Sequence, residues 1–134
     1  MINSHMKKLV VYFTLAVGLF FLQTPELEGA AIHALLVGDT FDQDIGEDCL
    51  KDIQNMNNLI REIAKQSEMS AQVTIMQGRQ ATTVDVLNFL NHLTVGKDDT
   101  LVLYFSMHGF RNVQRNNPWP VLLFIENDTG LDFS

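Results

Sequence analysis

From position 32 onward, the apolar residues follow two patterns: short continuous runs, and segments in which they recur every three or four residues. Short runs rich in apolar and β-branched residues occupy 32–38, 70–76, 100–106 and 121–126, each bounded by polar or glycine-containing segments. Such runs predict strands. Successive side chains of a strand point to opposite faces, and the runs at 32–38 and 100–106 have apolar residues on both faces. That is typical of strands buried on both faces of a parallel sheet. We therefore expect 100–106 to be a central strand.

Two segments between these runs have the three- and four-residue spacing of an amphipathic helix. In the first, from about 47 to 66, the apolar positions are Leu50, Ile53, Met56, Ile60, Ile63 and Ala64. The second helix is expected over 84–93, with Thr82 and Asp85 forming a capping-box pattern at its start. The order strand-helix-strand-helix-strand-loop-strand predicts an α/β fold with a mainly parallel sheet and helices on both faces.

Residues 1–31 differ from the rest of the chain and are expected to be a signal peptide. Two lysines at 7–8 precede an apolar run over 9–22, and Gly29 and Ala31 form a small-x-small cleavage site. The run is shorter than the about 20 residues that span a bilayer, so we favour cleavage over an uncleaved membrane anchor. Residues 1–5 are either a cloning remnant or an earlier start. We expect the chain to be exported, either secreted or retained in the periplasm or cell envelope.

Length and composition narrow the classes of function for the remaining segment, 32–134. The 134-residue chain suits one domain, and 46% hydrophobic residues can supply its core. The net charge of −7 argues against a nucleic-acid-binding surface. Cys49 is the single cysteine, so the fold does not depend on an intrachain disulfide.

Polar residues directly follow the first and third predicted strands. If these strands are parallel, the polar residues lie at the same edge of the sheet. Asp39 follows the first strand, and Ser106, His108 and Gly109 stand at the end of the third. Catalytic groups gather beyond the carboxyl ends of strands in such folds. An imidazole there can act as a general base, and a glycine N–H can stabilise an oxyanion. Position alone leaves open that His108 only caps a buried strand.

Three stretches carry a more specific pattern: "HALLVGDT" at 33–40, "DCLKDIQNMNNLI" at 48–60 and "DTLVLYFSMHGF" at 99–110. Together they resemble the amino-terminal half of caspase-like cysteine peptidases, the superfamily of caspases and metacaspases. The resemblance implies a caspase-like α/β/α sandwich, with His108 as the general base of a Cys–His dyad and Gly109 as an oxyanion donor. It also implies that Cys49, Asp52 and Ser106 line a pocket for a basic substrate side chain, where a carboxylate suits Arg or Lys.

The sequence departs from the family pattern at three places within these motifs. Met107 replaces a glycine before His108, Asp48 stands where the pattern has glycine, and Lys51 replaces an asparagine beside Asp52, where its charge could oppose cation binding. In the family the nucleophilic cysteine follows the next helix and strand, whereas this sequence reaches Ser134 without it. We therefore expect the domain to be truncated before the nucleophile, inactive alone, and completed by a carboxy-terminal cysteine-bearing portion. Its substrates would be peptides or proteins.

Other functions remain open at this level. The runner-up is a non-catalytic caspase-like pseudoenzyme that acts as an exported protein-interaction module. Cys49 as the nucleophile is less favoured, and a small-molecule-binding domain lacks a glycine-rich phosphate loop. No metal site is expected, because the histidines at 33, 92 and 108 lie on different elements without ligand spacing. No cofactor is expected, although the resemblance to metacaspases allows calcium dependence without assignable ligands.

Overall fold

The computed structural model describes residues 29–111, 120–124 and 129–131. Most of the expected signal peptide, residues 1–28, therefore lies outside the described residues. In chain order the elements are β1 (Ala31–Gly38), α2 (Gly46–Gln66), β2 (Ser70–Gln77), a 3₁₀ turn (Gly78–Gln80), α3 (Thr83–His92), β3 (Thr100–Ser106), β4 (Gly109–Phe110), β5 (Val121–Phe124) and β6 (Thr129–Leu131). The first three predicted strands and both predicted helices are confirmed, with ends that differ by one residue at most.

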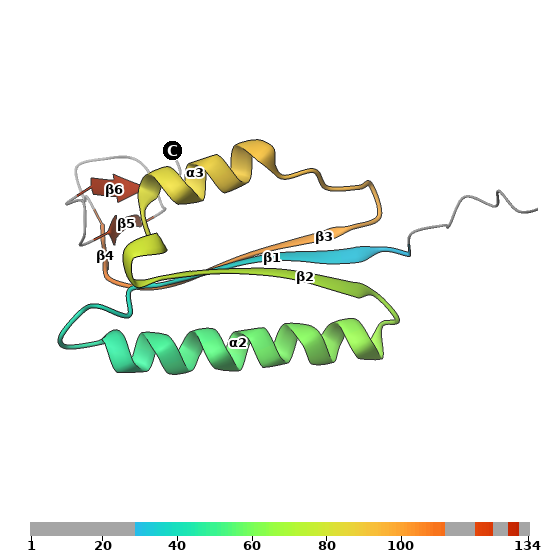
Figure 1. Ribbon diagram of the computed structural model, residues 1–134, viewed down its shortest axis with the longest axis horizontal. Helices are drawn as coiled ribbons and strands as arrows, with labels where there is room; N and C mark the ends of the chain where they lie inside the picture. The colour runs from blue at the N-terminus through green and yellow to red at the C-terminus, as the bar shows by residue number, and fades with distance from the viewer. Residues whose placement is uncertain (1–28, 112–119, 125–128, 132–134) are drawn as a thin grey trace, which may run out of the picture.

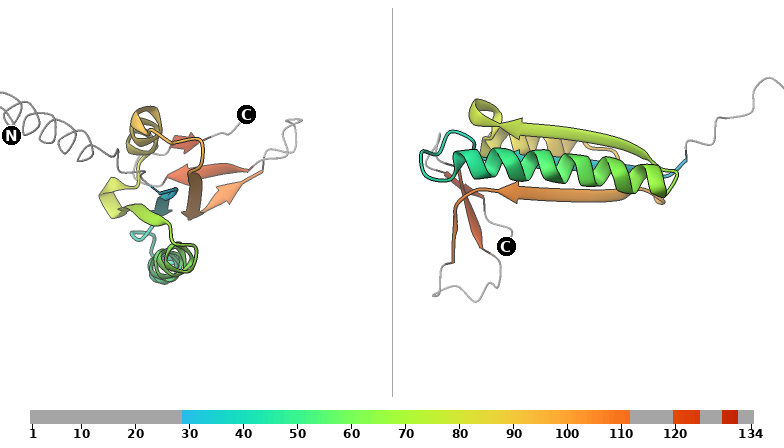
Figure 2. Two further views of the ribbon diagram at one scale, coloured as in Figure 1. Left: turned by 90° about the vertical axis from the view of Figure 1, so that its right-hand side faces the viewer. Right: turned by 90° about the horizontal axis from the view of Figure 1, so that it is seen from below.

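A three-stranded parallel sheet in the order β2-β1-β3 lies between the two helices. Helix α2 covers one face of the sheet and α3 the other (Figures 1 and 2). The prediction of an α/β fold with a parallel sheet and helices on both faces is confirmed at this level. β1 is the central strand, and all eight of its residues are buried.

The core has two parts, one on each face of β1. Ile32, Ala34 and Leu36 of β1 pack with buried residues of α2, namely Ile53, Ile60 and Ala64. Leu35 and Val37 pack on the other face with Ala81, Val86, Phe124 and Leu131. The period-two alternation of β1 and the helical spacing of α2 therefore produce the first cluster directly.

Thr82 caps the start of α3, as the sequence predicts. Its Oγ1 accepts a hydrogen bond from the Asp85 N–H at 3.1 Å and donates one to Asp85 Oδ2 at 2.8 Å. The cap satisfies one of the amide donors that a helix leaves without a partner in its first turn.

Two expectations about the later strands are wrong. β3 is not central: among the described residues it pairs only with β1, and the side chains of Leu101 and Leu103 are exposed. β5 does not extend the parallel sheet; it pairs antiparallel with β4 and β6 in a separate small sheet. Only residues 111–120 separate β4 from β5, a connection that suits an antiparallel pair, since a parallel pair needs a crossover of a dozen or more residues. The fourth predicted strand, 121–126, begins at Val121 as expected, while 125–128 lie outside the described residues.

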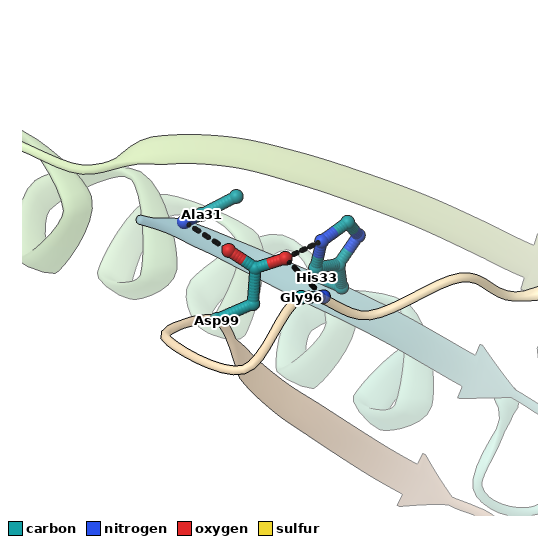
Figure 3. A network of polar contacts seen from close by, with 4 residues as sticks. All are labelled: Ala31, His33, Gly96 and Asp99. Atoms are coloured by element: carbon teal, nitrogen blue, oxygen red, sulfur yellow. Dashed lines mark hydrogen bonds and ion pairs between the residues drawn. The ribbon is translucent and has the colours of Figure 1, made fainter. Parts of the chain in front are cut away.

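A hydrogen-bonded cluster joins β1 to the loop before β3 at the amino-terminal edge of the sheet (Figure 3). The Asp99 carboxylate accepts the N–H of Ala31 at 2.8 Å and that of Gly96 at 2.7 Å. Its Oδ2 also lies 3.0 Å from Nε2 of the buried His33. These contacts, led by the Ala31 N–H, hold the pKa of Asp99 below its ordinary value.

The lowered pKa of Asp99 predicts a loss of stability in acid. A carboxyl group with a pKa of about 3.9 in the unfolded chain and a lower one in the fold stabilises the fold fully above the unfolded value. That stabilisation disappears as the pH falls through the folded pKa. Asp99→Asn should therefore flatten the dependence of the free energy of unfolding on pH below about pH 5. Urea unfolding at successive pH values measures it, and Asp98→Asn, at an exposed neighbour, should keep the parent's slope.

Candidate functional site

The ends of β1 and β3 meet at one edge of the sheet, here called the carboxyl edge. Gly38 is paired with Ser106, and the Asp39 N–H donates to the Ser106 carbonyl at 3.0 Å. The expected meeting of Asp39 with the Ser106–Gly109 segment is thus confirmed. The Asp39 side chain is buried, and its Oδ2 has no hydrogen-bond partner among the described residues.

A tight loop over 39–45 connects β1 to α2 beside this edge. Asp42 Oδ1 accepts the N–H groups of Asp44 at 2.7 Å and Ile45 at 2.9 Å, and the Asp42 carbonyl accepts the Gly46 N–H at 3.1 Å. Gly46 is required by close packing, since a Cβ at this position would lie 2.7 Å from the Thr40 carbonyl oxygen. The loop therefore holds the Asp42 carboxylate in a fixed direction.

His108 follows β3 and faces this loop. Its side chain is 47% exposed, and its Nε2 lies 3.4 Å from Asp42 Oδ2. The Asp42 side chain is only 11% exposed. The Ile45 and Asp44 N–H groups, with a smaller contribution from the charge of His108, hold the pKa of Asp42 below its ordinary value. The imidazole is thus solvent-accessible and has a carboxylate beside it.

Asp42 is a residue of this site that the sequence does not single out. It is 66 positions from His108 and lies in a loop with several other acidic residues. The available signal was local: an Asp in the turn that leads into a helix, four residues before its start at Gly46, often accepts backbone N–H groups. That signal predicts a turn but not a contact with His108.

Asp52 and Ser106, two of the three expected pocket residues, are in contact. The Ser106 hydroxyl donates to Asp52 Oδ2 at 2.9 Å across 54 positions of sequence, from β3 to α2. Lys51 does not pair with Asp52; its Nζ lies 2.9 Å from Glu47 Oε1 and 3.5 Å from Asp48 Oδ1. The Asp52 carboxylate therefore keeps its negative charge available at an exposed position.

Cys49, the third expected pocket residue, is buried on α2 with 3% of its surface exposed. Its thiol is free. Burial first, and then the neighbouring charge of Asp52, raise the pKa of the Tyr104 phenol on β3. Cys49 is three residues before Asp52 on α2, so the two lie on the same face of the helix, but Cys49 is covered from solvent.

The backbone of Gly109 lies at the start of β4. The Leu123 N–H donates to the His108 carbonyl at 2.9 Å, so residues 108 and 123 form a hydrogen-bonded pair of the antiparallel ladder. Hydrogen-bonded and non-bonded pairs alternate along such ladders, and Gly109 is opposite Leu122 in the next pair. The Gly109 N–H therefore points away from β5.

The described residues were also compared with what a ligand cavity, a metal site and a membrane-spanning helix require. A cavity of about 1220 Å³ is at the opposite edge of the sheet, where His33 and Asp99 are among its lining residues. Within residues 29–111, 120–124 and 129–131, no three His, Cys, Asp or Glu side chains are grouped as metal ligands would be. None of the helices in this part of the chain is both long and apolar enough to cross a bilayer.

Comparisons of the chain with protein-family models, with curated proteins and with solved structures gave no match.

Proposed function

We propose that this chain is the histidine-bearing half of a caspase-like cysteine endopeptidase, with His108 as the general base. The observation that carries the proposal is the position of His108, beside Asp42, at the same carboxyl edge of the sheet as the Asp52–Ser106 pair. This is the edge at which α/β folds collect catalytic groups. The motifs that resemble the caspase-like family supply the same residues.

In the proposed reaction, the nucleophilic thiol comes from a carboxy-terminal portion of the gene product. His108 takes the thiol proton as sulfur attacks the scissile carbonyl carbon, and it returns that proton to the leaving amine. The Gly109 N–H would donate to the carbonyl oxygen as it becomes an oxyanion. This role is supported by the direction of that N–H, away from the β5 ladder.

The edge of β3 is a suitable surface for that carboxy-terminal portion. Leu101 and Leu103 expose apolar side chains there, and in the described chain only β1 pairs with β3. A further strand added along β3 would cover both leucines. The caspase-like sandwich, larger than the three-stranded sheet described above, is part of this proposal.

The substrate side chain proposed for the pocket is basic. Asp52 is an exposed carboxylate whose Oδ2 is oriented by the Ser106 hydroxyl, and Lys51 is engaged by Glu47 and Asp48. A guanidinium or ammonium group could form a charge-assisted hydrogen bond with this carboxylate.

Peptide selectivity tests this assignment. The gene product with its carboxy-terminal portion should cleave peptides with Arg or Lys before the scissile bond in preference to matched peptides with Asp. Asp52→Asn should lower kcat/KM for the basic peptides by about 10- to 100-fold, the loss expected for a hydrogen bond to a charged group.

Asp48→Asn is the matched control, because Asp48 lies on the same helix and its carboxylate faces Lys51. It should leave the selectivity unchanged. Preferential cleavage after Asp, or an equal loss in both variants, would contradict the role of Asp52.

The second candidate is a non-catalytic, exported caspase-like module that acts by protein contact. The exposed apolar side chains of Leu101, Leu103 and Phe110 favour it, because a binding surface needs no catalytic histidine. Both candidates include export directed by residues 1–31. The intact mass of the exported product would reveal cleavage near 29–31 or a retained amino terminus.

A further inference from the structure

We propose that Asp42 is a positioning residue that fixes the imidazole of His108, so that Nδ1 is the nitrogen that accepts the thiol proton and returns it during peptide hydrolysis. The inference rests on the proposed function of His108 as a general base. It adds a third group to the Cys–His pair and assigns the roles of the two ring nitrogens.

The geometry distinguishes this pair from an ordinary surface ion pair. One oxygen of Asp42, Oδ1, is held by the N–H groups of Asp44 and Ile45. The other, Oδ2, is 3.4 Å from Nε2 of His108. With the Asp42 side chain only 11% exposed, little rotation is available to it. Long, exposed side chains lose entropy when they pair, whereas this carboxylate is already fixed by its own loop.

The two partners are also held relative to each other by the backbone. The Asp39 N–H ties the start of the loop to the Ser106 carbonyl, two residues before His108. The Gly46 N–H ties the end of the loop to the Asp42 carbonyl. The separation between the carboxylate and the imidazole is therefore set by the ends of β1 and β3 and by the start of α2.

The chemical consequence is a choice of tautomer. A carboxylate accepts hydrogen bonds, so neutral His108 should carry its proton on Nε2 and leave the lone pair on Nδ1. As the thiol sulfur bonds to the carbonyl carbon, its proton moves to Nδ1 and the carbonyl π electrons move to oxygen. When the C–N bond breaks, Nδ1 returns that proton to the leaving amine. The Asp42 carboxylate stabilises the imidazolium formed between these steps.

Asp42→Asn gives a sharp test in this chain by ¹⁵N NMR of the histidine ring. The asparagine Oδ1 can still accept the two backbone N–H groups, so its NH₂ takes the position of Oδ2 and donates to Nε2. The variant should then move the proton of neutral His108 from Nε2 to Nδ1.

Asp44→Asn is the control, since it removes the same charge from an exposed position of the same loop. It should leave the tautomer unchanged. An Nε2 proton retained in Asp42→Asn, or the same tautomer change in Asp44→Asn, would overturn the proposal.

The NMR measurement needs no peptidase activity, so it separates this inference from the proposed function. If the tautomer changes but His108→Ala cleaves peptides as well as the parent, the pairing stands and the peptidase assignment fails. In the active gene product, Asp42→Asn should lower kcat by about 10²-fold or more with little change in KM, as a wrong tautomer does. A change in KM alone would contradict a positioning role.

Discussion

His108→Ala is expected to lower peptide hydrolysis by the complete gene product about 10²–10⁴-fold, the range typical of losing a general base. The reason is that no other imidazole is available at the carboxyl edge: within the described residues, His33 lies at the opposite edge and His92 ends α3. Initial rates with a peptide carrying Arg before the scissile bond would measure the effect. Cleavage by His108→Ala at the parent's rate would exclude the Cys–His dyad.

The same variant also separates catalysis from strand capping. What His108 contributes to the described fold through its backbone is the carbonyl that accepts the Leu123 N–H, and alanine keeps that carbonyl. The imidazole is nearly half exposed, so its removal should change the free energy of unfolding by about 0.5 kcal/mol or less. If the variant instead unfolds, and activity falls only as far as the folded fraction does, His108 is the polar strand cap that the sequence also allows.

The central part of the fold was predictable because burial leaves a local trace in the sequence. β1 is apolar at nearly every position since both of its faces are covered, and α2 has three- and four-residue spacing since only one of its faces is. The Thr82–Asp85 cap is likewise a contact between close neighbours in sequence. Each of these signals lies within a few residues of the structure it specifies.

The order of strands at the sheet edge was not predictable in the same way. The run at 100–106 is as apolar as a central strand, yet Leu103 is 39% exposed and β3 has one partner strand among the described residues. An apolar run specifies a surface to be covered but not what covers it. The mismatch between pattern and exposure is consistent with the proposed carboxy-terminal portion along β3.

The candidate site likewise contains residues that could be predicted from the sequence and one that could not. Residues at the ends of strands could be assigned to the carboxyl edge, because parallel pairing of Gly38 with Ser106 follows from the topology. The role of Asp42 could not be predicted, because the 39–45 loop folds back through backbone hydrogen bonds before its carboxylate meets His108. Contacts made by loop geometry have no periodic signature.

The largest effect on stability is expected at Leu35. Its side chain is fully buried on the central strand and packs against the cluster that contains Val86 and Phe124. Leu35→Ala should lower the free energy of unfolding by about 2–5 kcal/mol, from the lost transfer of apolar surface and the cavity left behind. A domain of this size is commonly stable by about 5–15 kcal/mol, so the variant would lose a large share of its stability. Urea unfolding followed by circular dichroism would measure the change.

Leu103 provides the matched control, because the parallel register places it directly opposite Leu35 on β3. With 39% of its surface exposed, Leu103→Ala should cost about 1 kcal/mol or less in this chain. A cost equal to that of Leu35→Ala would mean that the outer edge of β3 is already covered, for example by a second copy of the chain. The proposed carboxy-terminal portion makes a further difference measurable: in the complete gene product, where a strand along β3 would bury Leu103, the same substitution should cost about 2–5 kcal/mol.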